Sequence, residues 1–417
     1  MSLVTTLPGL VNAHVHGAYG PQFRGLRPSL QFERYLVDVA CRDLATPSAD
    51  DYRACSLVTG LENLSAGCTA LVDHYYGPRS SAYVYGVARS YEAIGIRAWV
   101  LVDVSDLPYV AYTRELYPRF VDAVPESELP PMVKSALRAQ LPDRPAAELV
   151  AEVEELVRGW NPSRVRLGLG LGNPVWASDE LLEAAARLVR DSQVPLTVHA
   201  EESPLQRRVS FAQWGMSGVA RLASFGLLSE RTLVSHAVQI DADDIDLLAR
   251  HGTSVSHNPI SNLKLQNGIA PVGALLDAGV NLCLGSDGQS SADSQSIFSA
   301  MKFVSALAGL NGLRGRDELP EDAALRMATA NGHRLWWDDD PSGDAVELAE
   351  PLGPYAHTWD DPVPSIAEVY VGGERRLAAA RELVRESGAL ETVLRLREEA
   401  AGYEGESFSA RYLSPSG

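Results

Sequence analysis

The sequence predicts an α/β fold of the (β/α)8 TIM barrel type. Short apolar runs alternate with longer stretches of helical period, which is typical of parallel strands connected by helices. Eight such runs occur between residues 10 and 285, and eight strand–helix units close into a barrel. The length of 417 residues is normal for a barrel of this kind that carries insertions.

The predicted strands are short, and polar residues or glycine end or follow most of them. They cover residues 10–14, 69–73, 96–103, 164–170, 195–199, 232–236, 253–256 and 280–285. Three of the intervening helices have recognisable ends. Ser178 is a good N-cap for a helix over 179–191, Asp241 opens a segment that ends at Gly252, and Pro271 opens one that ends at Gly279.

The composition restricts the partners and the compartment. A balance of 54 acidic to 36 basic residues gives a net charge of -18, which disfavours nucleic acid and anionic membranes as partners. The four cysteines show no C-x-x-C spacing, so we expect neither a zinc knuckle nor a disulfide framework. No basic segment precedes an apolar run at the N-terminus, and no stretch approaches the ~18 apolar residues of a transmembrane helix. We therefore expect a cytoplasmic protein.

We divide the chain into a barrel over residues 1–335 and an extension over 336–417. Residues 105–162 form an insertion rich in Pro, Glu and Arg, with a helix predicted at 146–158. Such an insertion lies at the barrel mouth, so we interpret it as a lid or a dimer contact, with a solvated helical excursion as the alternative. The extension is expected to contain a loop, one strand at 367–372, helices over 374–399 and a mobile tail.

Polar residues at the strand ends predict a metal site. His14 and His16 end the first strand, and because side chains alternate along a strand, both point to the same face. On its own the pair could equally be two surface or core histidines. However, His199, His236 and Asp287 follow later strands, and such positions converge at one rim of a barrel. Burying so many polar groups is costly without a common partner such as a metal ion.

Several motifs resemble the amidohydrolase superfamily, in particular its branch of triazine chlorohydrolases and of purine, adenosine-derivative and guanine deaminases. They are P-G-L-V-N-A-H-V-H-G, H-A-E-E, S-H-A, S-H-N-P-I-S-N-L-K-L-Q-N-G-I-A-P-V and L-G-S-D-G, in this order. The resemblance spans about residues 7 to 335. It implies one bound zinc or iron ion and hydrolysis of a C–N or C–Cl bond on a heteroaromatic ring.

The resemblance also implies roles for individual residues. The implied metal ligands are His14, His16, His199 and Asp287. His236 matches the residue that orients the water and polarises the substrate, and Glu202 matches the proton shuttle. Asp287 would also accept the proton of the attacking water. Independent chemistry agrees, because three imidazoles and one carboxylate suit Zn²⁺ or Fe²⁺ and leave a position open.

The substrate-contacting segments depart from the family pattern. Relatives carry a histidine in a segment like H-A-P-Y-S after the fourth strand, whereas this chain has Asn173 and Trp176 there. After the second strand, His74 could bind a ring substituent, and Tyr75 or Tyr76 could stack on the ring; packing at the barrel mouth is the alternative. In the segment 257–264 we expect Asn258 and its neighbours Ser261, Asn262 and Lys264 to support the site.

The two ends depart as well. Relatives have β-structure ahead of the Pro-Gly segment and return to it after the barrel, whereas this chain lacks the second signature. We therefore expect the accessory β-domain to be reduced or missing. Trp336, Trp337 and C-terminal helices, or formation of a homodimer or higher homo-oligomer, would then cover the apolar surface.

The combined prediction is a mononuclear metal-dependent amidohydrolase. The expected reaction is hydrolytic deamination of a small heterocyclic substrate, such as a purine, pyrimidine, pterin or triazine-like ring. Hydrolytic dechlorination and opening of a cyclic amide would use the same groups. A metal-dependent lyase or decarboxylase and a catalytically silent barrel are the alternatives from other classes, since a fold does not determine a reaction.

Overall fold

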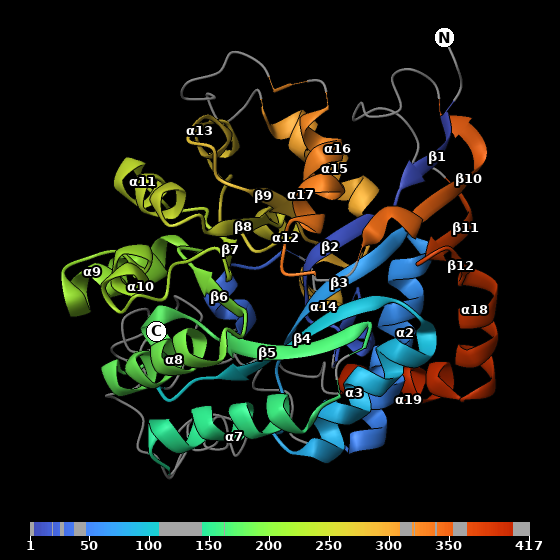
Figure 1. Ribbon diagram of the computed structural model, residues 1–417, viewed down its shortest axis with the longest axis horizontal. Helices are drawn as coiled ribbons and strands as arrows, with labels where there is room; N and C mark the ends of the chain where they lie inside the picture. The colour runs from blue at the N-terminus through green and yellow to red at the C-terminus, as the bar shows by residue number, and fades with distance from the viewer. Residues whose placement is uncertain are drawn as a thin grey trace.

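The computed structural model describes residues 4–18, 20–25, 29–36, 47–107, 144–161, 163–308, 319–320, 322–337, 340–352 and 365–402. Its centre is a parallel eight-stranded sheet in the order β2-β3-β4-β5-β6-β7-β8-β9 (Figure 1). The strands are β2 (Leu10–Val15), β3 (Cys68–Tyr75), β4 (Arg97–Val104), β5 (Val165–Leu171), β6 (Leu196–Ala200), β7 (Thr232–His236), β8 (Ser254–His257) and β9 (Leu282–Leu284). Each overlaps one predicted strand, which confirms the (β/α)8 barrel.

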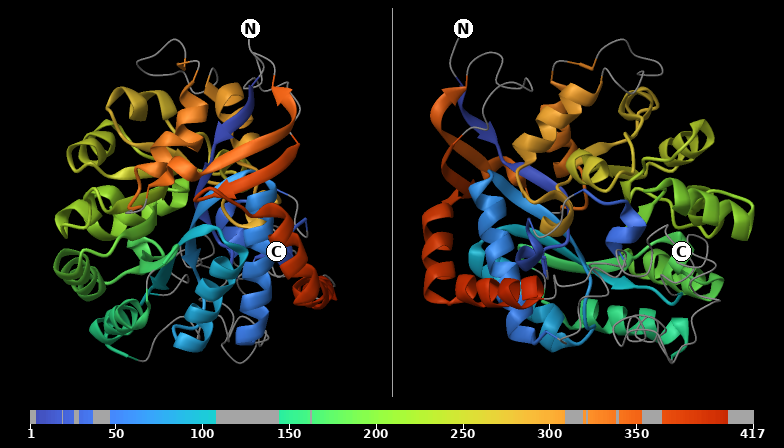
Figure 2. Two further views of the ribbon diagram at one scale, coloured as in Figure 1. Left: turned by 45° about the vertical axis from the view of Figure 1, so that its right-hand side comes forward. Right: turned by 180° about the vertical axis from the view of Figure 1, so that it is seen from behind.

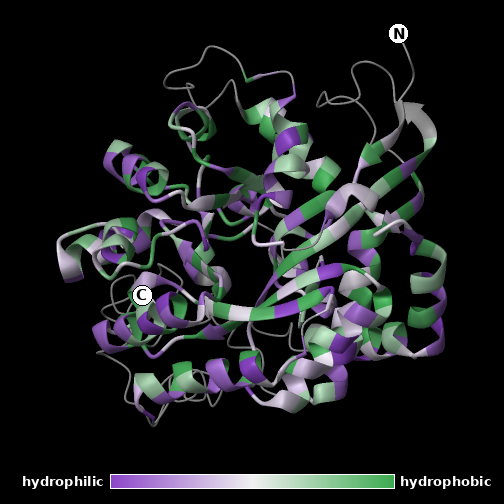
Figure 3. Ribbon diagram, in the orientation of Figure 1, coloured by the Kyte–Doolittle hydropathy of each residue, from purple (hydrophilic) through white to green (hydrophobic). Residues whose placement is uncertain are grey.

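Helices surround the strands as an outer layer (Figure 2). The larger ones are α2 (Ala49–Ser65), α3 (Ser81–Ile94), α7 (Ala146–Gly159), α8 (Asp179–Ser192), α9 (Pro204–Trp214), α10 (Gly218–Ser224), α11 (Ala242–Arg250), α13 (Val272–Asp277) and α15 (Ile297–Ala308). Their N-termini follow the sequence signals, because Ser178 caps α8 and Asp241 caps α11 through side-chain oxygens that accept backbone N–H groups. The helices alternate apolar and polar segments, whereas the strands are largely apolar (Figure 3).

Short helical segments complete the layer and carry several loop residues of the site. They are η1 (Pro21–Phe23), α1 (Phe32–Tyr35), η4 (Pro174–Trp176), α12 (Pro259–Lys264), α14 (Gln289–Ala292), α16 (Ala323–Ala328), α17 (Ala330–His333) and η5 (Pro341–Gly343). None of the helices within the described ranges combines the length and the apolar character that crossing a membrane requires.

The helix expected inside the 105–162 insertion is present as α7. It packs against α8 and β5 and so takes the ordinary place of the barrel helix that follows β4. Its buried residues Leu149, Val153 and Leu156 form the apolar face of this contact. Residues 108–143 of the insertion lie outside the described ranges, and the lid or dimer contact expected there stays a prediction.

A small antiparallel sheet lies beside the barrel, in the order β1-β10-β11-β12 (Figure 1). It pairs β1 (Val4–Pro8) with β10 (Ala345–Leu352), β11 (Ile366–Val371) and β12 (Glu374–Arg375). We expected one strand here, at 367–372, and β11 occupies that position. A second strand, β10, forms in the segment that we expected to be a loop. It was missed because its partner is β1 at the far end of the chain, and no local pattern reveals such a pairing.

Two further groups of residues attach the C-terminal segment to the barrel. The helices α18 (Leu377–Glu386) and α19 (Ala389–Gly402) pack against α2. Trp336 meets Trp99 edge to face, with 5.9 Å between the ring centroids, within an apolar cluster that includes Leu101 and Leu233. Trp336 therefore covers apolar barrel surface, as expected from the sequence.

A buried ion pair joins the small sheet to the barrel. The guanidinium of Arg97 on β4 donates to both carboxylate oxygens of Asp344, at 2.9 and 3.1 Å. The same carboxylate accepts the backbone N–H of Gly372 at 2.7 Å. Such a bidentate pair is geometrically specific, so it determines how the two sheets meet.

Candidate active site

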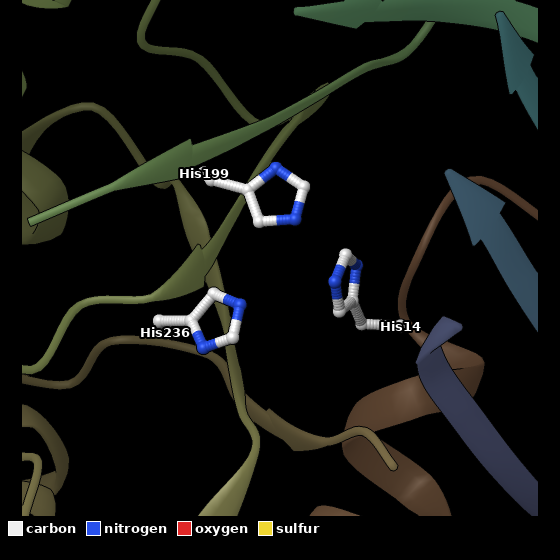
Figure 4. Close-up of side chains that lie close together, drawn as sticks. All are labelled: His14, His199 and His236. Atoms are coloured by element: carbon white, nitrogen blue, oxygen red, sulfur yellow. The ribbon is translucent and has the colours of Figure 1, made fainter. Parts of the chain in front are cut away.

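Four imidazoles converge at the carboxyl ends of the barrel strands. His14 comes from β2, His199 from β6 and His236 from β7, and their rings point toward one another (Figure 4). The ring centroid of His14 lies 4.8 Å from those of His16 and His199 and 5.5 Å from that of His236. The Nε2 atoms of His16 and His199 are 3.2 Å apart. The sequence expectation that these side chains share one rim is therefore met by the geometry.

Asp287 completes this cluster from the end of β9. Its Oδ1 atom lies 3.3 Å from Nε2 of His16 and 3.6 Å from Nε2 of His14. The N–H of Gly288 donates to Oδ1 at 2.7 Å, and the hydroxyl of Ser261 donates to Oδ2. The backbone of Asp287 is left-handed, with φ of 65°. Such a conformation is costly for a residue with a side chain and tends to occur where function requires it.

Hydrogen bonds at the second ring nitrogen orient three of the histidines. Nδ1 of His16 lies 2.9 Å from the carbonyl oxygen of His74, and Nδ1 of His236 lies 2.8 Å from Oδ1 of Asn262. Because these oxygens only accept, both histidines carry their proton on Nδ1 and turn the lone pair of Nε2 to the centre. Nδ1 of His14 lies 3.0 Å from the hydroxyl of Ser235.

The charges of the cluster suit a divalent cation. Burial lowers the pKa of His14 to about 3 and that of His199 well below the ordinary value, with the neighbouring histidines adding to the shift. Burial alone would raise the pKa of Asp287, but its close contact with His14 and the other nearby histidines hold it well below its usual range. Neutral imidazoles and an ionised carboxylate are the protonation states that metal binding requires.

The hydrogen bonding of the ligand atoms is also consistent with a bound ion. Nε2 of His14 is buried and has no hydrogen-bond partner among the described residues. A buried polar atom without a partner is rare in folded proteins. An ion held by His14, His16, His199 and Asp287 would satisfy this atom and would have three nitrogen ligands and one oxygen ligand, which suits zinc.

Glu202 lies beside the cluster, directly after β6. Its Oε1 atom accepts a hydrogen bond from Nδ2 of Asn267 at 3.0 Å and is 3.8 Å from Nε2 of His236. Burial raises the pKa of Glu202 well above its ordinary value, and the charges of Asp287 and Glu33 raise it further. A raised pKa favours the protonated form of a carboxyl, which is the form that can donate a proton.

The neighbouring Glu201 points elsewhere. Its oxygens accept hydrogen bonds from the backbone N–H of Gly218 at 2.6 Å and from the guanidinium of Arg207 at 3.3 Å. This arrangement agrees with the choice of Glu202 over Glu201 from the sequence.

Comparison with known proteins agrees with this arrangement. The family model described as "Amidohydrolase family" matches residues 5–336, which is more than half of the chain. The chain belongs to the amidohydrolase family.

Curated relatives of this amidohydrolase include two archaeal deaminases. The 5'-deoxyadenosine deaminase of Methanothermobacter thermautotrophicus is 31% identical over 331 residues, which is 79% of this chain and 68% of the relative. The 5-methylthioadenosine/S-adenosylhomocysteine deaminase of Thermococcus onnurineus is 30% identical over 329 residues, which is 78% of this chain and 68% of the relative.

Solved structures with the same fold include an adenosine deaminase and a triazine hydrolase. The zinc-bound adenosine deaminase of Xanthomonas campestris has a TM-score of 0.72 and 23% identity, with 94% of this chain and 86% of that chain covered. The triazine hydrolase of Arthrobacter aurescens has a TM-score of 0.77 and 20% identity, with 95% and 87% covered. At these identities the likeness concerns the fold.

At the end of β3, the amidohydrolase places His74 and Tyr76 beside the histidine cluster. The ring of His74 stacks on that of Tyr76 at 4.8 Å and lies 4.7 Å from that of His199. Tyr75, in contrast, contacts Tyr52, and its hydroxyl donates to the carbonyl of Pro78 at 2.8 Å. The choice of Tyr75 as a substrate residue was therefore wrong. Alternation along β3 gives Tyr76 the face of His74 and Tyr75 the opposite one.

The other predicted substrate residues lie in the loops around the mouth. Oδ1 of Asn173 accepts the N–H of Val175 at 3.0 Å and so caps η4. Trp176 packs in a buried apolar cluster with Phe32, Val175, Leu205, Val209 and Leu265. Oδ1 of Asn258 accepts the hydroxyl of Ser256 at 3.1 Å. Asn258 thus contacts the end of β8, and its expected role in substrate binding and in support of the site stays a prediction.

Several supporting residues were not identified from the sequence. Ser235 and Asn267 contact His14 and Glu202, and Gln206 accepts the N–H of Glu202 at 2.8 Å. Ser235 precedes His236 in the S-H-A motif, which is the signal that could have revealed it. Asn267 lies 65 positions from Glu202, and no local pattern connects residues that far apart.

Proposed function

We propose that this amidohydrolase deaminates an aminated heteroaromatic ring, with one zinc ion held by His14, His16, His199 and Asp287. The observation that carries the proposal is the juxtaposition of a metal-ligand cluster and a buried carboxyl group. The imidazoles of His14, His16 and His199 and the carboxylate of Asp287 converge at the strand ends. The carboxyl of Glu202 lies 3.8 Å from Nε2 of His236.

The protein groups around the ion divide the proton transfers between them. A zinc ion held by these residues would supply a water nucleophile near neutral pH by lowering the pKa of that water. His236, fixed by Asn262 at 2.8 Å, would orient the water through the lone pair of Nε2. Asp287 would accept one proton of the water, and Glu202 would donate its own proton to a ring nitrogen. Glu202 would then take the remaining proton of the former water and pass it to the departing amine, and the proton on Asp287 would restore Glu202. Oxygen from water replaces the amino group on the ring, and ammonia leaves.

The substrate class is supported by the surroundings of the cluster and by the relatives. The aromatic ring of Tyr76, beside those of His16 and His199, offers a flat surface for a heterocycle. Both relatives described above are deaminases of adenosine derivatives. Purine, pyrimidine, pterin and triazine-like rings are therefore the compounds to test first.

The first experiment is elemental analysis of the purified protein, followed by an ammonia-release assay on aminated rings of these four types. We expect about one zinc per chain and ammonia from at least one ring. Binding of iron in its place would change the identity of the ion and keep the reaction. Absence of metal after reconstitution would contradict the proposal.

A second measurement separates the alternatives. Turnover in ¹⁸O-labelled water puts the label into the product of a hydrolase and leaves the product of a lyase or decarboxylase unlabelled. Release of chloride, or of a ring-opened acid, without ammonia would indicate dechlorination or cyclic amide opening at the same site. Glu202→Gln, assayed in parallel, controls for activity of contaminants.

The expected homodimer or higher oligomer and the cytoplasmic location stay predictions. Size-exclusion chromatography with light scattering tests the first, and fractionation of the source cells tests the second.

A further inference from the structure

The four histidines of the cluster differ in what their second ring nitrogen contacts. Nδ1 of His14, His16 and His236 meets an oxygen of Ser235, His74 and Asn262, at 2.8 to 3.0 Å. Nδ1 of His199 is buried and has no hydrogen-bond partner among the described residues. A histidine that binds a metal through Nε2 carries a proton on Nδ1, and this N–H almost always has an acceptor. An acceptor for His199 is therefore required.

Two other imidazole nitrogens close to His199 lack a hydrogen-bond partner among the described residues, Nε2 of His14 and Nδ1 of His74. Nε2 of His14 is a proposed metal-ligand atom, which leaves Nδ1 of His74. The rings of His74 and His199 are 4.7 Å apart between centroids and inclined by 40°. Nδ1 of His74 is buried and has no hydrogen-bond partner within the described ranges. The two nitrogens belong to neighbouring rings, and a single N–H···N bond between them would satisfy both.

Asp103 determines which nitrogen of His74 can accept. Nε2 of His74 lies 2.9 Å from Oδ1 of Asp103, and the hydroxyl of Ser105 donates to Oδ2 at 3.3 Å. Burial raises the pKa of Asp103 to about 7, while the charge of Arg79 and the hydrogen bond from Ser105 act in the opposite direction and favour the carboxylate. A carboxylate accepts the proton of Nε2, so Nδ1 of His74 carries a lone pair.

Neighbouring residues pack closely around the ring of His74. A Cβ atom on Gly170 of β5 would lie 2.9 Å from Nε2 of His74, which leaves no room for a side chain at that position. The opposite face of the His74 ring is covered by Tyr76, at 4.8 Å and with an angle of only 5° between the rings. Burial lowers the pKa of His74 well below its ordinary value, which is consistent with a neutral ring.

We propose that His74 is a positioning residue of the metal site, whose Nδ1 accepts a hydrogen bond from Nδ1–H of His199 and is fixed for this role by Asp103. The inference rests on the proposed function, because it assumes that His199 is a metal ligand. It differs from the sequence expectation, in which His74 contacts the substrate. A substrate contact would change KM and leave zinc affinity unchanged, whereas a positioning residue changes zinc affinity itself.

The test compares two replacements of His74 by zinc titration in competition with a chromophoric chelator. His74→Leu removes the acceptor and keeps an apolar volume, and we expect its zinc Kd to rise about 10- to 100-fold. His74→Asn places an amide oxygen close to the position of Nδ1, so most of the zinc affinity should return. The control is Asp106→Asn, since Asp106 follows β4, the strand that holds Asp103, but accepts hydrogen bonds from Ser178.

The outcomes separate the inference from the proposed function. Wild-type zinc affinity in His74→Leu, or equal loss in the Leu and Asn variants, overturns the inference alone. A wild-type protein that binds no zinc contradicts the proposed metal site as well. If His74→Leu does not fold, ¹⁵N NMR of the zinc-loaded wild type decides. The inference requires the ring proton of His74 on Nε2 and that of His199 on Nδ1. A proton on Nδ1 of His74 would overturn the inference.

Discussion

Replacing Glu202 by glutamine removes the proposed proton donor at nearly constant shape. General acid–base catalysis contributes about 10²- to 10⁴-fold to the rate, and each factor of ten corresponds to about 1.4 kcal/mol of activation free energy. We therefore expect kcat of Glu202→Gln to fall by about 10²- to 10⁴-fold, or about 3 to 5 kcal/mol.

The neighbours of Glu202 indicate that the variant folds. Both carboxyl oxygens face donors, Asn267 at 3.0 Å and Gln206 at 3.5 Å, so the new amide must turn its NH₂ group toward one of them. Gln206 is fixed, because its own oxygen accepts the N–H of Glu202. Asn267 can rotate, since its Oδ1 has no hydrogen-bond partner among the described residues. The loss of stability should not exceed the ~1 kcal/mol of one hydrogen bond.

Three measurements test this reasoning on one preparation: zinc content, the urea midpoint of unfolding and the rate of ammonia release. We expect full zinc content, a midpoint close to the wild type and strongly reduced turnover. Loss of zinc from Glu202→Gln would move Glu202 into the ligand set. Turnover within about tenfold of the wild type, below the contribution expected of a general acid, would refute its role as the proton donor.

Three further predictions follow from the same geometry. Asp287→Asn should lose most of its zinc in elemental analysis, because an amide replaces the charged ligand; retention of both zinc and activity would exclude Asp287 as a ligand. Because the pKa of Glu202 is raised, the folded protein retains a proton that the unfolded chain releases. The free energy of unfolding of the metal-free protein should therefore decline as pH rises above ~4.5. Urea titrations of Glu202→Gln should show a weaker decline. Asp344→Ala should lower the free energy of unfolding by about 3 to 5 kcal/mol, since Arg97 stays buried without its partner; an unchanged urea midpoint would contradict this.

The barrel and the residues of its histidine cluster could be predicted because their signals are local. Each strand is a short apolar run, and His14, His16, His199 and Asp287 stand where such runs end. The topology of a barrel then brings strand ends together whatever their separation in sequence.

The supporting contacts required the structure. Asn262 and His236 are 26 positions apart, and Ser235 and His14 are 221 apart, so no periodicity connects them. The error over Tyr75 was avoidable, because strand alternation assigns Tyr76 to the face of His74. The strand β10 (Ala345–Leu352) was missed because its pairing with β1 joins the two ends of the chain.

The backbone hydrogen bond between Asp287 and His14 joins the first and last strands of the barrel. The ladder of paired strands runs from β2 to β9, and the N–H of Asp287 donates to the carbonyl of His14 at 2.9 Å across the two ends. Both residues are also proposed ligands of one ion. A tightly bound ion would therefore hold the first and last strands together at this seam of the barrel. The free energy required to open the seam would increase with the logarithm of the ion concentration. Amides along this seam should then exchange with solvent more slowly in the loaded protein than in the metal-free one.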